Sequence, residues 1–118
     1  MGSKRKALVA KADKYFSLYI RKRDEICVTC GARDNLQCGH LFSRIAYSTR
    51  WDEYNAYCQC RSCNLYHEAC PAPLTNYFLS KYGQGAYMAL YQKYRTTHKY
   101  YDADLEEIAN YYKEKLNG

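Results

Sequence analysis

Two C-x-x-C pairs constrain this 118-residue chain more than any other feature. A pair of this kind is typical of a tight knuckle that presents two thiolates, and four thiolates are a common ligand set of structural zinc. The separation between the pairs leaves room for a β-hairpin. The same cysteines would serve a disulfide framework, although nothing in the sequence indicates an oxidising compartment. The sequence therefore predicts structural zinc on Cys27, Cys30, Cys60 and Cys63.

Three further cysteines, Cys38, Cys58 and Cys70, exceed what one zinc ion needs. In a reducing cytosol a free cysteine usually behaves as a small buried hydrophobe, and we predict that role for all three. Cys58 lies close to the second pair, so it is the one that could be confused with a zinc ligand.

The charge balance predicts a polyanionic partner. The chain carries 18 Lys and Arg against 12 Asp and Glu, a formal net charge of +6. Nucleic-acid-binding, ribosomal and membrane-surface proteins share such an excess. No apolar run approaches membrane-spanning length, and no signal-peptide core is present at the N-terminus, so we expect a cytoplasmic protein without a membrane partner.

Residues 4–24 are predicted to form an amphipathic helix, because apolar residues recur at steps of three and four. Its other faces carry eight cations against two acids. A solvated face is the ordinary explanation, but this imbalance favours contact with a DNA backbone. The predicted DNA contacts on this helix are Lys11, Lys14, Arg21 and Lys22. Arg44 and Arg50 follow His40 in the segment between the two cysteine pairs, and they are also predicted to lie near the functional site. Each is either a phosphate contact or an ordinary surface charge.

The remaining elements follow from turn and cap residues. A strand is predicted to lead into His40, and a short helix to begin near Asn64 and to end before Pro71 and Pro73. Three tail helices are predicted: 74–82, ending at Gly83 as a C-cap; 86–97, with Met88 on its apolar stripe; and a last helix capped by Asp102.

The order His40, Asn55, Asn64 inside the cysteine pairs resembles the HNH motif of ββα-metal (His-Me finger) nucleases. The closest similarity is to the phage NinG/Rap recombination proteins, which resolve branched DNA. It is carried by the segments 19–24, 27–31, 36–40 and 59–64 and by the helical spacing of the tail.

The resemblance implies a role for each motif residue. His40 is the expected general base, Asn55 the residue that holds the loop, and Asn64 a ligand of a catalytic Mg²⁺ or Mn²⁺ ion. Three and four residues beyond Asn64, His67 and Glu68 could reach the same cation from one helix face. We rank His67 first, because some NinG-like sequences have a histidine at the matching position.

The chain departs from the HNH pattern at two positions. Many HNH enzymes have Asp immediately before the histidine, where this chain has Gly39. Some relatives have Asp three residues before it, and this chain has Gln37. The expected cation site is therefore poor in negative charge, with weak Mg²⁺ affinity or reliance on a DNA phosphate.

We expect one α+β domain over residues 1–118. It would combine a zinc-clipped ββα-metal core (27–70), a basic N-terminal helix (4–24) and a helical tail (74–117). The resemblance implies a metal-dependent endonuclease that acts on Holliday junctions or D-loops in the cytoplasm of a phage-infected bacterium. Cleaving a junction twice would suit a homodimer. The alternatives are an HNH nicking or restriction-type nuclease on duplex DNA and a non-catalytic zinc-ribbon DNA-binding protein.

Overall fold

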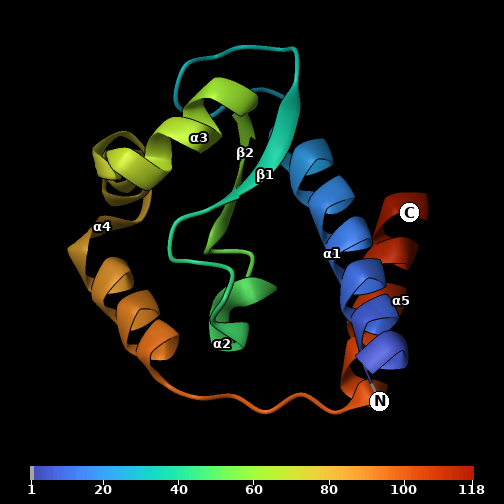
Figure 1. Cartoon of the computed structure of the whole chain (residues 1–118). Coiled ribbons are helices and arrows are strands. Elements are labelled where there is room, and N and C mark those ends of the chain that lie inside the picture. Colours follow the sequence, from blue (N-terminus) through green and yellow to red (C-terminus); the bar gives the residue numbers. More distant parts are fainter. Residues whose placement is uncertain (1) are drawn as a thin grey trace.

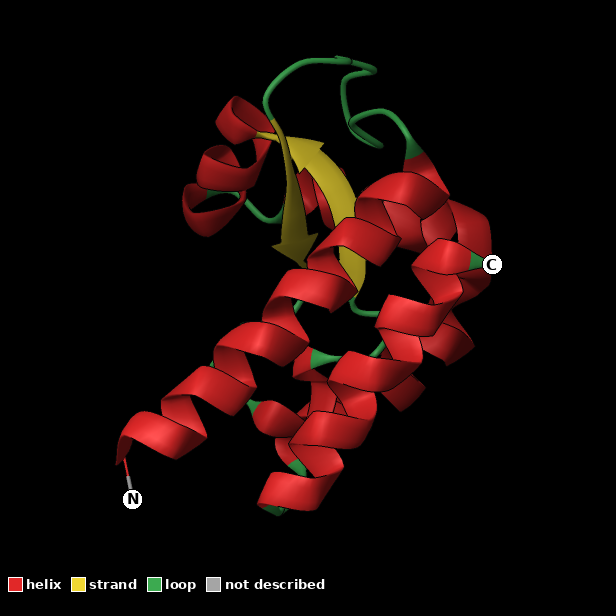
Figure 2. Ribbon diagram, turned by 90° about the vertical axis from the view of Figure 1, so that its right-hand side faces the viewer, coloured by secondary structure: helices red, strands yellow, loops and turns green. Residues whose placement is uncertain are grey.

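The computed structural model describes residues 2–118 and contains a two-stranded sheet placed between helices (Figure 1). The elements are α1 (Gly2–Asp24), β1 (Leu36–His40), α2 (Tyr47–Arg50), β2 (Ala56–Cys60), α3 (Arg61–Ala69), α4 (Ala72–Arg95) and α5 (Asp102–Asn117). β1 and β2 are antiparallel. α1 and α5 lie side by side on one side of the sheet, and α3 and α4 lie on the other (Figures 1 and 2). The α+β class is as predicted.

Both faces of the sheet are covered, because successive side chains of a strand point to opposite sides. Ala56 belongs to the apolar cluster that α1 and α5 form, and Cys38 packs against that cluster. Tyr57 belongs to a second cluster with Leu74 and Phe78 of α4. This double coverage explains why every residue of β2 is buried, the polar Gln59 included.

The predicted apolar face of the N-terminal helix is confirmed. Ala12, Phe16 and Ile20 recur every four residues, are buried, and pack in one cluster with residues of α5. The Phe16 ring meets the Tyr112 ring edge to face at a centroid distance of 5.0 Å. Among the cations of α1, Lys4, Lys6 and Lys14 are exposed, whereas Arg5 and Arg23 bond to other parts of the chain.

Two predicted helix starts are wrong. α3 begins at Arg61 rather than near Asn64, because Cys60 is its N-cap and the Cys60 sulfur accepts a hydrogen bond from the Cys63 amide at 3.5 Å. Asp102 is the first residue of α5 and not its cap. Instead the Asp104 carboxylate accepts a hydrogen bond from the Tyr101 amide at 2.8 Å, which satisfies a donor before the first turn.

The predicted break at Gly83 is confirmed: α4 consists of two helical halves that meet at a kink there. Gly83 has φ 88° and ψ 171°, a left-handed value that interrupts the helix. The second half ends at Arg95, two residues before the predicted end. Met88 is 43% exposed and therefore lies outside the core. The short helix α2 has no counterpart among the predicted elements. Within residues 2–118 no helix is long and apolar enough to cross a membrane.

Candidate functional site

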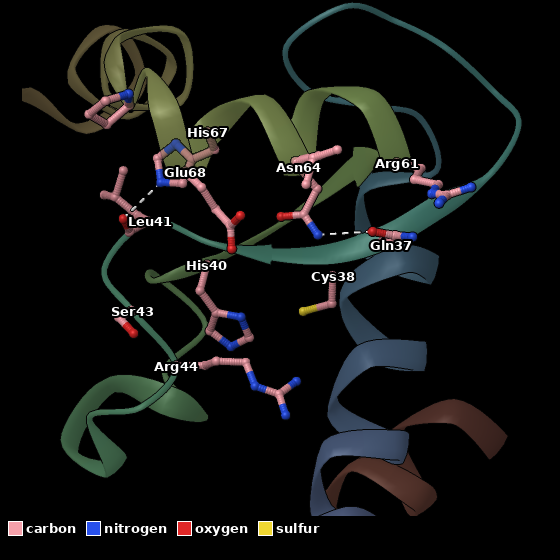
Figure 3. Close-up of a pocket in the computed structure, with 12 residues that line it drawn as sticks. Gln37, Cys38, His40, Leu41, Ser43, Arg44, Arg61, Asn64, His67 and Glu68 are labelled. Atoms are coloured by element: carbon pink, nitrogen blue, oxygen red, sulfur yellow. Dashed lines mark hydrogen bonds between the residues drawn. The ribbon is translucent and has the colours of Figure 1, made fainter.

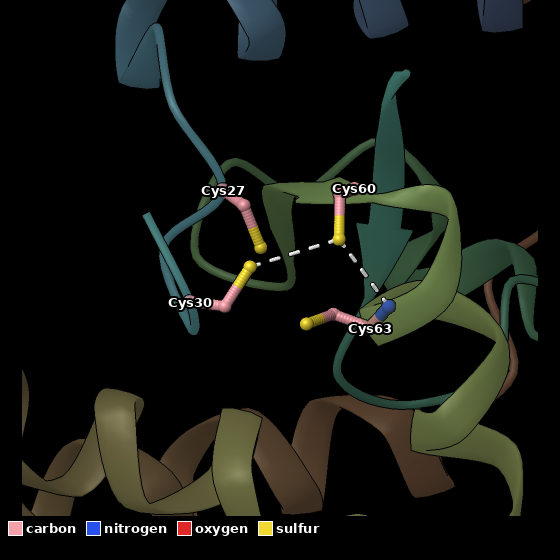
Figure 4. Close-up of side chains that lie close together, drawn as sticks. All are labelled: Cys27, Cys30, Cys60 and Cys63. Atoms are coloured by element: carbon pink, nitrogen blue, oxygen red, sulfur yellow. Dashed lines mark hydrogen bonds between the residues drawn. The ribbon is translucent and has the colours of Figure 1, made fainter. Parts of the chain in front are cut away.

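Four cysteine thiols gather where the loop after α1 meets the start of α3 (Figure 4). The sulfurs of Cys27, Cys30, Cys60 and Cys63 all lie within 4.8 Å of one another. Cys30 and Cys60 have their sulfurs 3.7 Å apart. This is close to the edge of about 3.8 Å expected for a tetrahedron with zinc–sulfur bonds of about 2.3 Å. It is far longer than the disulfide bond of about 2.05 Å. The predicted grouping is confirmed, and the four thiols are positioned to hold a zinc ion.

The first knuckle is shaped by its backbone. The Gly31 amide donates to the Cys27 carbonyl at 2.8 Å, and Gly31 adopts a left-handed φ of 81° that closes the turn. Burial raises the pKa of the Cys27 thiol, but hydrogen bonds from the Thr29 side chain and from nearby backbone groups outweigh burial and lower that pKa to about 6. Cys27 is thus prepared to act as a thiolate, which is the form that binds a metal.

The other three cysteines stay outside the cluster as free thiols. Cys58 is fully buried on the α1 side of the sheet, and burial raises its pKa to about 11. Burial likewise raises the pKa of Cys38 to about 12. Both are therefore neutral thiols at pH 7. Cys70 is half-buried at the end of α3.

His40 ends β1 and lines a cavity of about 560 Å³ between α3 and the loop that follows β1 (Figure 3). Its Nε2 atom lies 2.9 Å from the Arg50 carbonyl oxygen. A carbonyl can only accept, so Nε2 carries the hydrogen and Nδ1 keeps a free lone pair. Burial lowers the pKa of His40, and Arg44 lowers it further, whereas the Arg50 carbonyl opposes the change. The imidazole is therefore neutral at pH 7.

Asn55 is fully buried and ties the loop after His40 to the start of β2. Its side-chain oxygen accepts from the Phe42 amide at 2.8 Å. Its side-chain nitrogen donates to the Phe42 carbonyl at 3.0 Å and to the Thr49 carbonyl at 3.1 Å. These three bonds fix the loop that carries Arg50, whose carbonyl in turn orients His40.

Asn64, His67 and Glu68 face the same cavity from α3 (Figure 3). The Asn64 side-chain nitrogen donates to Gln37 Oε1 at 3.0 Å, which leaves its oxygen free. His67 is engaged elsewhere: its Nε2 lies 3.0 Å from the Leu41 carbonyl oxygen, and its Nδ1 is buried without a partner. Figure 3 shows the Glu68 carboxylate extending from α3 toward His40. Asn64 and Glu68 are thus the residues of α3 whose side-chain oxygens face the cavity and could bind a cation.

Gly39 occupies the position at which many HNH enzymes have an aspartate. A Cβ atom at this position would lie 2.3 Å from Gln59 Oε1 and 2.9 Å from Asn64 Oδ1. Contacts that short do not occur at real Cβ atoms, so no larger residue fits here while Gln59 keeps its place. The absence of an acid before His40 is therefore matched by a neighbouring side chain that fills the space.

Three of the predicted DNA contacts surround His40. Lys14, Arg21 and Arg44 line a second hollow of about 380 Å³, which shares His40 and Cys38 with the first cavity. Arg44 has a side chain that is 60% exposed. Lys11 lies on α1 but lines neither hollow.

Arg50 and Lys22 have other partners. Arg50 is 8% exposed, and its guanidinium binds both carboxylate oxygens of Asp13, at 3.0 and 2.6 Å. Its side chain therefore joins α2 to α1 and is not presented to a phosphate. Lys22 donates to the Leu116 carbonyl at 3.1 Å and so caps the last turn of α5.

Sequence reasoning missed Asp13 and Arg61. Asp13 also accepts from the Trp51 indole at 3.0 Å and lies 3.7 Å from Arg44. The sequence did contain one indication of a structural role for Asp13: it is an acid next to the apolar Ala12 on a helix that is rich in cations. Arg61 opens α3 and lines the His40 cavity. No local pattern distinguishes it from other surface arginines.

One of three comparisons with known proteins identifies the family of the chain. No curated protein and no solved structure matches the chain. The family model described as Bacteriophage Lambda NinG protein matches residues 3–118, which is nearly the whole chain. The match includes all four clustered cysteines and every residue that lines the His40 cavity. The chain therefore belongs to the NinG family of bacteriophage proteins.

Proposed function

We propose that this protein is a metal-dependent endonuclease that cleaves branched DNA during phage recombination, with His40 as general base. The observation that carries the proposal is the tautomer of His40. His40 donates its Nε2–H to the Arg50 carbonyl, so its Nδ1 atom is free to accept a proton. His40 lines a cavity that also contains side-chain oxygens of Asn64 and Glu68 and the cation of Arg44.

Hydrolysis of a phosphodiester needs a base for the attacking water and positive charge near the phosphate. His40 Nδ1 takes the proton from water, and the Arg50 carbonyl stabilises the imidazolium that results. Lys14, Arg21 and Arg44 bind the phosphates that flank the reacting one. Asn55 acts only as a positioning residue, because it holds the loop and does not line the cavity.

A divalent cation would be held by Asn64 and by one neighbour on α3. Mg²⁺ or Mn²⁺, when bound, neutralises charge on the scissile phosphate and on the leaving oxygen. We prefer Glu68 to His67 as the second ligand, because the Glu68 carboxylate extends toward His40 (Figure 3), whereas His67 is turned toward the Leu41 carbonyl. A carboxylate also supplies the negative charge that position 39 lacks.

The proposal is tested by incubating zinc-loaded protein and Mg²⁺ or Mn²⁺ with labelled Holliday junctions, D-loops and linear duplexes of the same sequences. Cleavage confined to the branched substrates is expected. Equal cleavage of the linear duplex would point to a nicking or restriction-type nuclease. Binding without cleavage of any substrate would point to a non-catalytic zinc-ribbon protein.

Replacing Lys14, Arg21 and Arg44 together by alanine should weaken binding to every DNA structure. Each lost phosphate contact lowers the slope of log affinity against log salt by about 0.9 on duplex DNA. The matched control replaces Lys81, Lys99 and Lys115, which line neither hollow and lie over tyrosine rings. The measurement is fluorescence anisotropy over a salt series. If both triple variants change the slope equally, net charge and not this surface controls binding.

A further inference from the structure

Asp13, on α1, fixes the end of α2 next to His40. Its carboxylate makes a bidentate contact with the Arg50 guanidinium: Oδ1 accepts from Nε at 3.0 Å and Oδ2 from Nη2 at 2.6 Å. Oδ1 also accepts from the Trp51 indole at 3.0 Å. One carboxylate of α1 therefore holds both the last residue of α2 and the residue that caps it.

These contacts reach His40 through the backbone of Arg50. The Arg50 carbonyl accepts from His40 Nε2 at 2.9 Å, and the side chain of the same residue is the group that Asp13 binds. The Arg50 guanidinium also donates to the Arg44 carbonyl at 3.0 Å, so it ties the loop after β1 to α2. The path from Asp13 to the His40 ring thus consists of one side chain and one carbonyl, both of Arg50.

The contact between Asp13 and Arg50 differs from an ordinary surface ion pair. The Arg50 side chain is 10% exposed and the Asp13 side chain 26% exposed, and a bidentate contact fixes orientation as well as distance. Asp13 also lines the second hollow, among the cations that we propose as phosphate contacts. A negative charge in that hollow opposes the binding of DNA phosphates. Substrate binding therefore does not explain why an acid lies there.

We propose that Asp13 is a positioning residue for His40: it fixes Arg50, so that the Arg50 carbonyl holds the His40 ring by Nε2–H and leaves Nδ1 free. The inference rests on the proposed function only in that the orientation of His40 affects cleavage if His40 is the base. The orientation itself is a property of the protein without DNA. Asp13 touches neither substrate nor cation in this role, and it acts through Arg50 alone.

The test compares Asp13→Asn with Asp34→Asn, which removes the same charge from an exposed residue that lines neither hollow. Asparagine keeps the shape of aspartate but offers one acceptor oxygen in place of two, so the bidentate contact with Arg50 is lost. Zinc-loaded protein labelled with ¹⁵N-histidine gives the rate at which His40 Nε2–H exchanges with water, by nuclear magnetic resonance. The spectrum of His40→Ala identifies the resonance. Single-turnover cleavage of a junction and DNA affinity are measured on the same variants.

Asp13→Asn should make His40 Nε2–H exchange about tenfold faster or more, because a weakened contact opens more often. Cleavage should slow by about tenfold to 10²-fold, the scale expected of a misplaced catalytic group. DNA affinity should be unchanged or tighter, because a negative charge leaves the second hollow. Asp13→Glu keeps the charge and both oxygens, and it should recover part of both losses.

Arg50→Met keeps the carbonyl but has no guanidinium, so it should show the same defects as Asp13→Asn. The double variant should be no worse than either single one, because both changes break the same contact. The role of Asp13 is overturned if His40 exchanges at the same rate in Asp13→Asn and Asp34→Asn, or if DNA affinity falls by as much as the cleavage rate. Should Asp13→Asn not fold, the double variant decides, since it leaves no buried charge unpaired. Exchange at the wild-type rate in that protein excludes the role.

The outcome for Asp13 is separable from the outcome for the nuclease. Faster exchange of His40 Nε2–H in Asp13→Asn, in a protein that cleaves none of the DNA substrates, keeps the role of Asp13 and removes the proposed function. Cleavage that depends on His40, with exchange that does not change in Asp13→Asn, does the reverse.

Discussion

His40→Ala is expected to reduce single-turnover cleavage of a DNA junction by about 10²–10⁴-fold, the usual contribution of general-base catalysis. DNA affinity should stay near that of the wild type, because His40 bonds to the Arg50 carbonyl and the cations around it make the phosphate contacts. The measurement uses saturating enzyme, with zinc content and melting temperature as checks of the fold. His98→Ala is the matched control, since His98 is exposed and lines neither hollow.

The pH profile gives a second readout of the same residue. Burial lowers the pKa of His40 below its usual value, so the base stays neutral to a lower pH than a free histidine would. The acid limb of the cleavage rate should therefore have its midpoint below about 6.5. The unfolded chain binds this proton more readily, so His40 also removes stability as the pH falls through that value. A His40→Ala rate within a few-fold of wild type, with the same acid limb, would falsify the assignment of His40 as base.

The elements that the sequence predicted well depend on local spacing. The cysteine pairs form their knuckles within four residues each, and thiolate chemistry brings the two knuckles together. The four-residue recurrence of Ala12, Phe16 and Ile20 sets the buried face of α1 without knowledge of its partner. In both cases the residues that produce the structure lie within a few positions of one another in the sequence, so a local pattern is enough to predict it.

The features that were missed depend on pairs of residues far apart in the chain. Arg50 and Lys22 looked like free cations, but their partners are Asp13 and the Leu116 carbonyl, each on a helix that only the tertiary structure brings near. The cap of α3 was missed for a different reason. Cysteine is not a common N-cap, and Cys60 acts as one because the zinc knuckle already places its sulfur over the first turn.

The surroundings of Gly39 show the same limit on prediction. That Gln59 faces Gly39 follows from the strand register, in which Gly39 pairs with Tyr57 and Gln37 with Gln59. A shift of one residue would turn Gln59 to the α1 side of the sheet. The missing acid could be read from the sequence, but the residue that fills its space could not.

Removing the zinc is expected to cost more stability than any other change considered for this chain. The two strands are five residues each, and an isolated two-stranded sheet is marginal in water. The cysteine cluster joins the loop before β1 to the end of β2 and so clamps the sheet at the end opposite His40. Structural zinc contributes about 10–16 kcal/mol of apparent binding free energy in small zinc domains. This is comparable to the whole stability of a typical domain, about 5–15 kcal/mol.

We therefore expect one zinc per chain by metal analysis, and loss of the cooperative melting transition in circular dichroism when a strong chelator removes it. Cys27→Ser and Cys60→Ser should reproduce that loss, because a serine oxygen does not replace a thiolate. Cys70→Ser, outside the cluster, is the matched control and should keep both zinc and melting temperature. Protein that contains no zinc, and whose four clustered cysteines react with thiol reagents while folded, would show that the thiols gather without a metal.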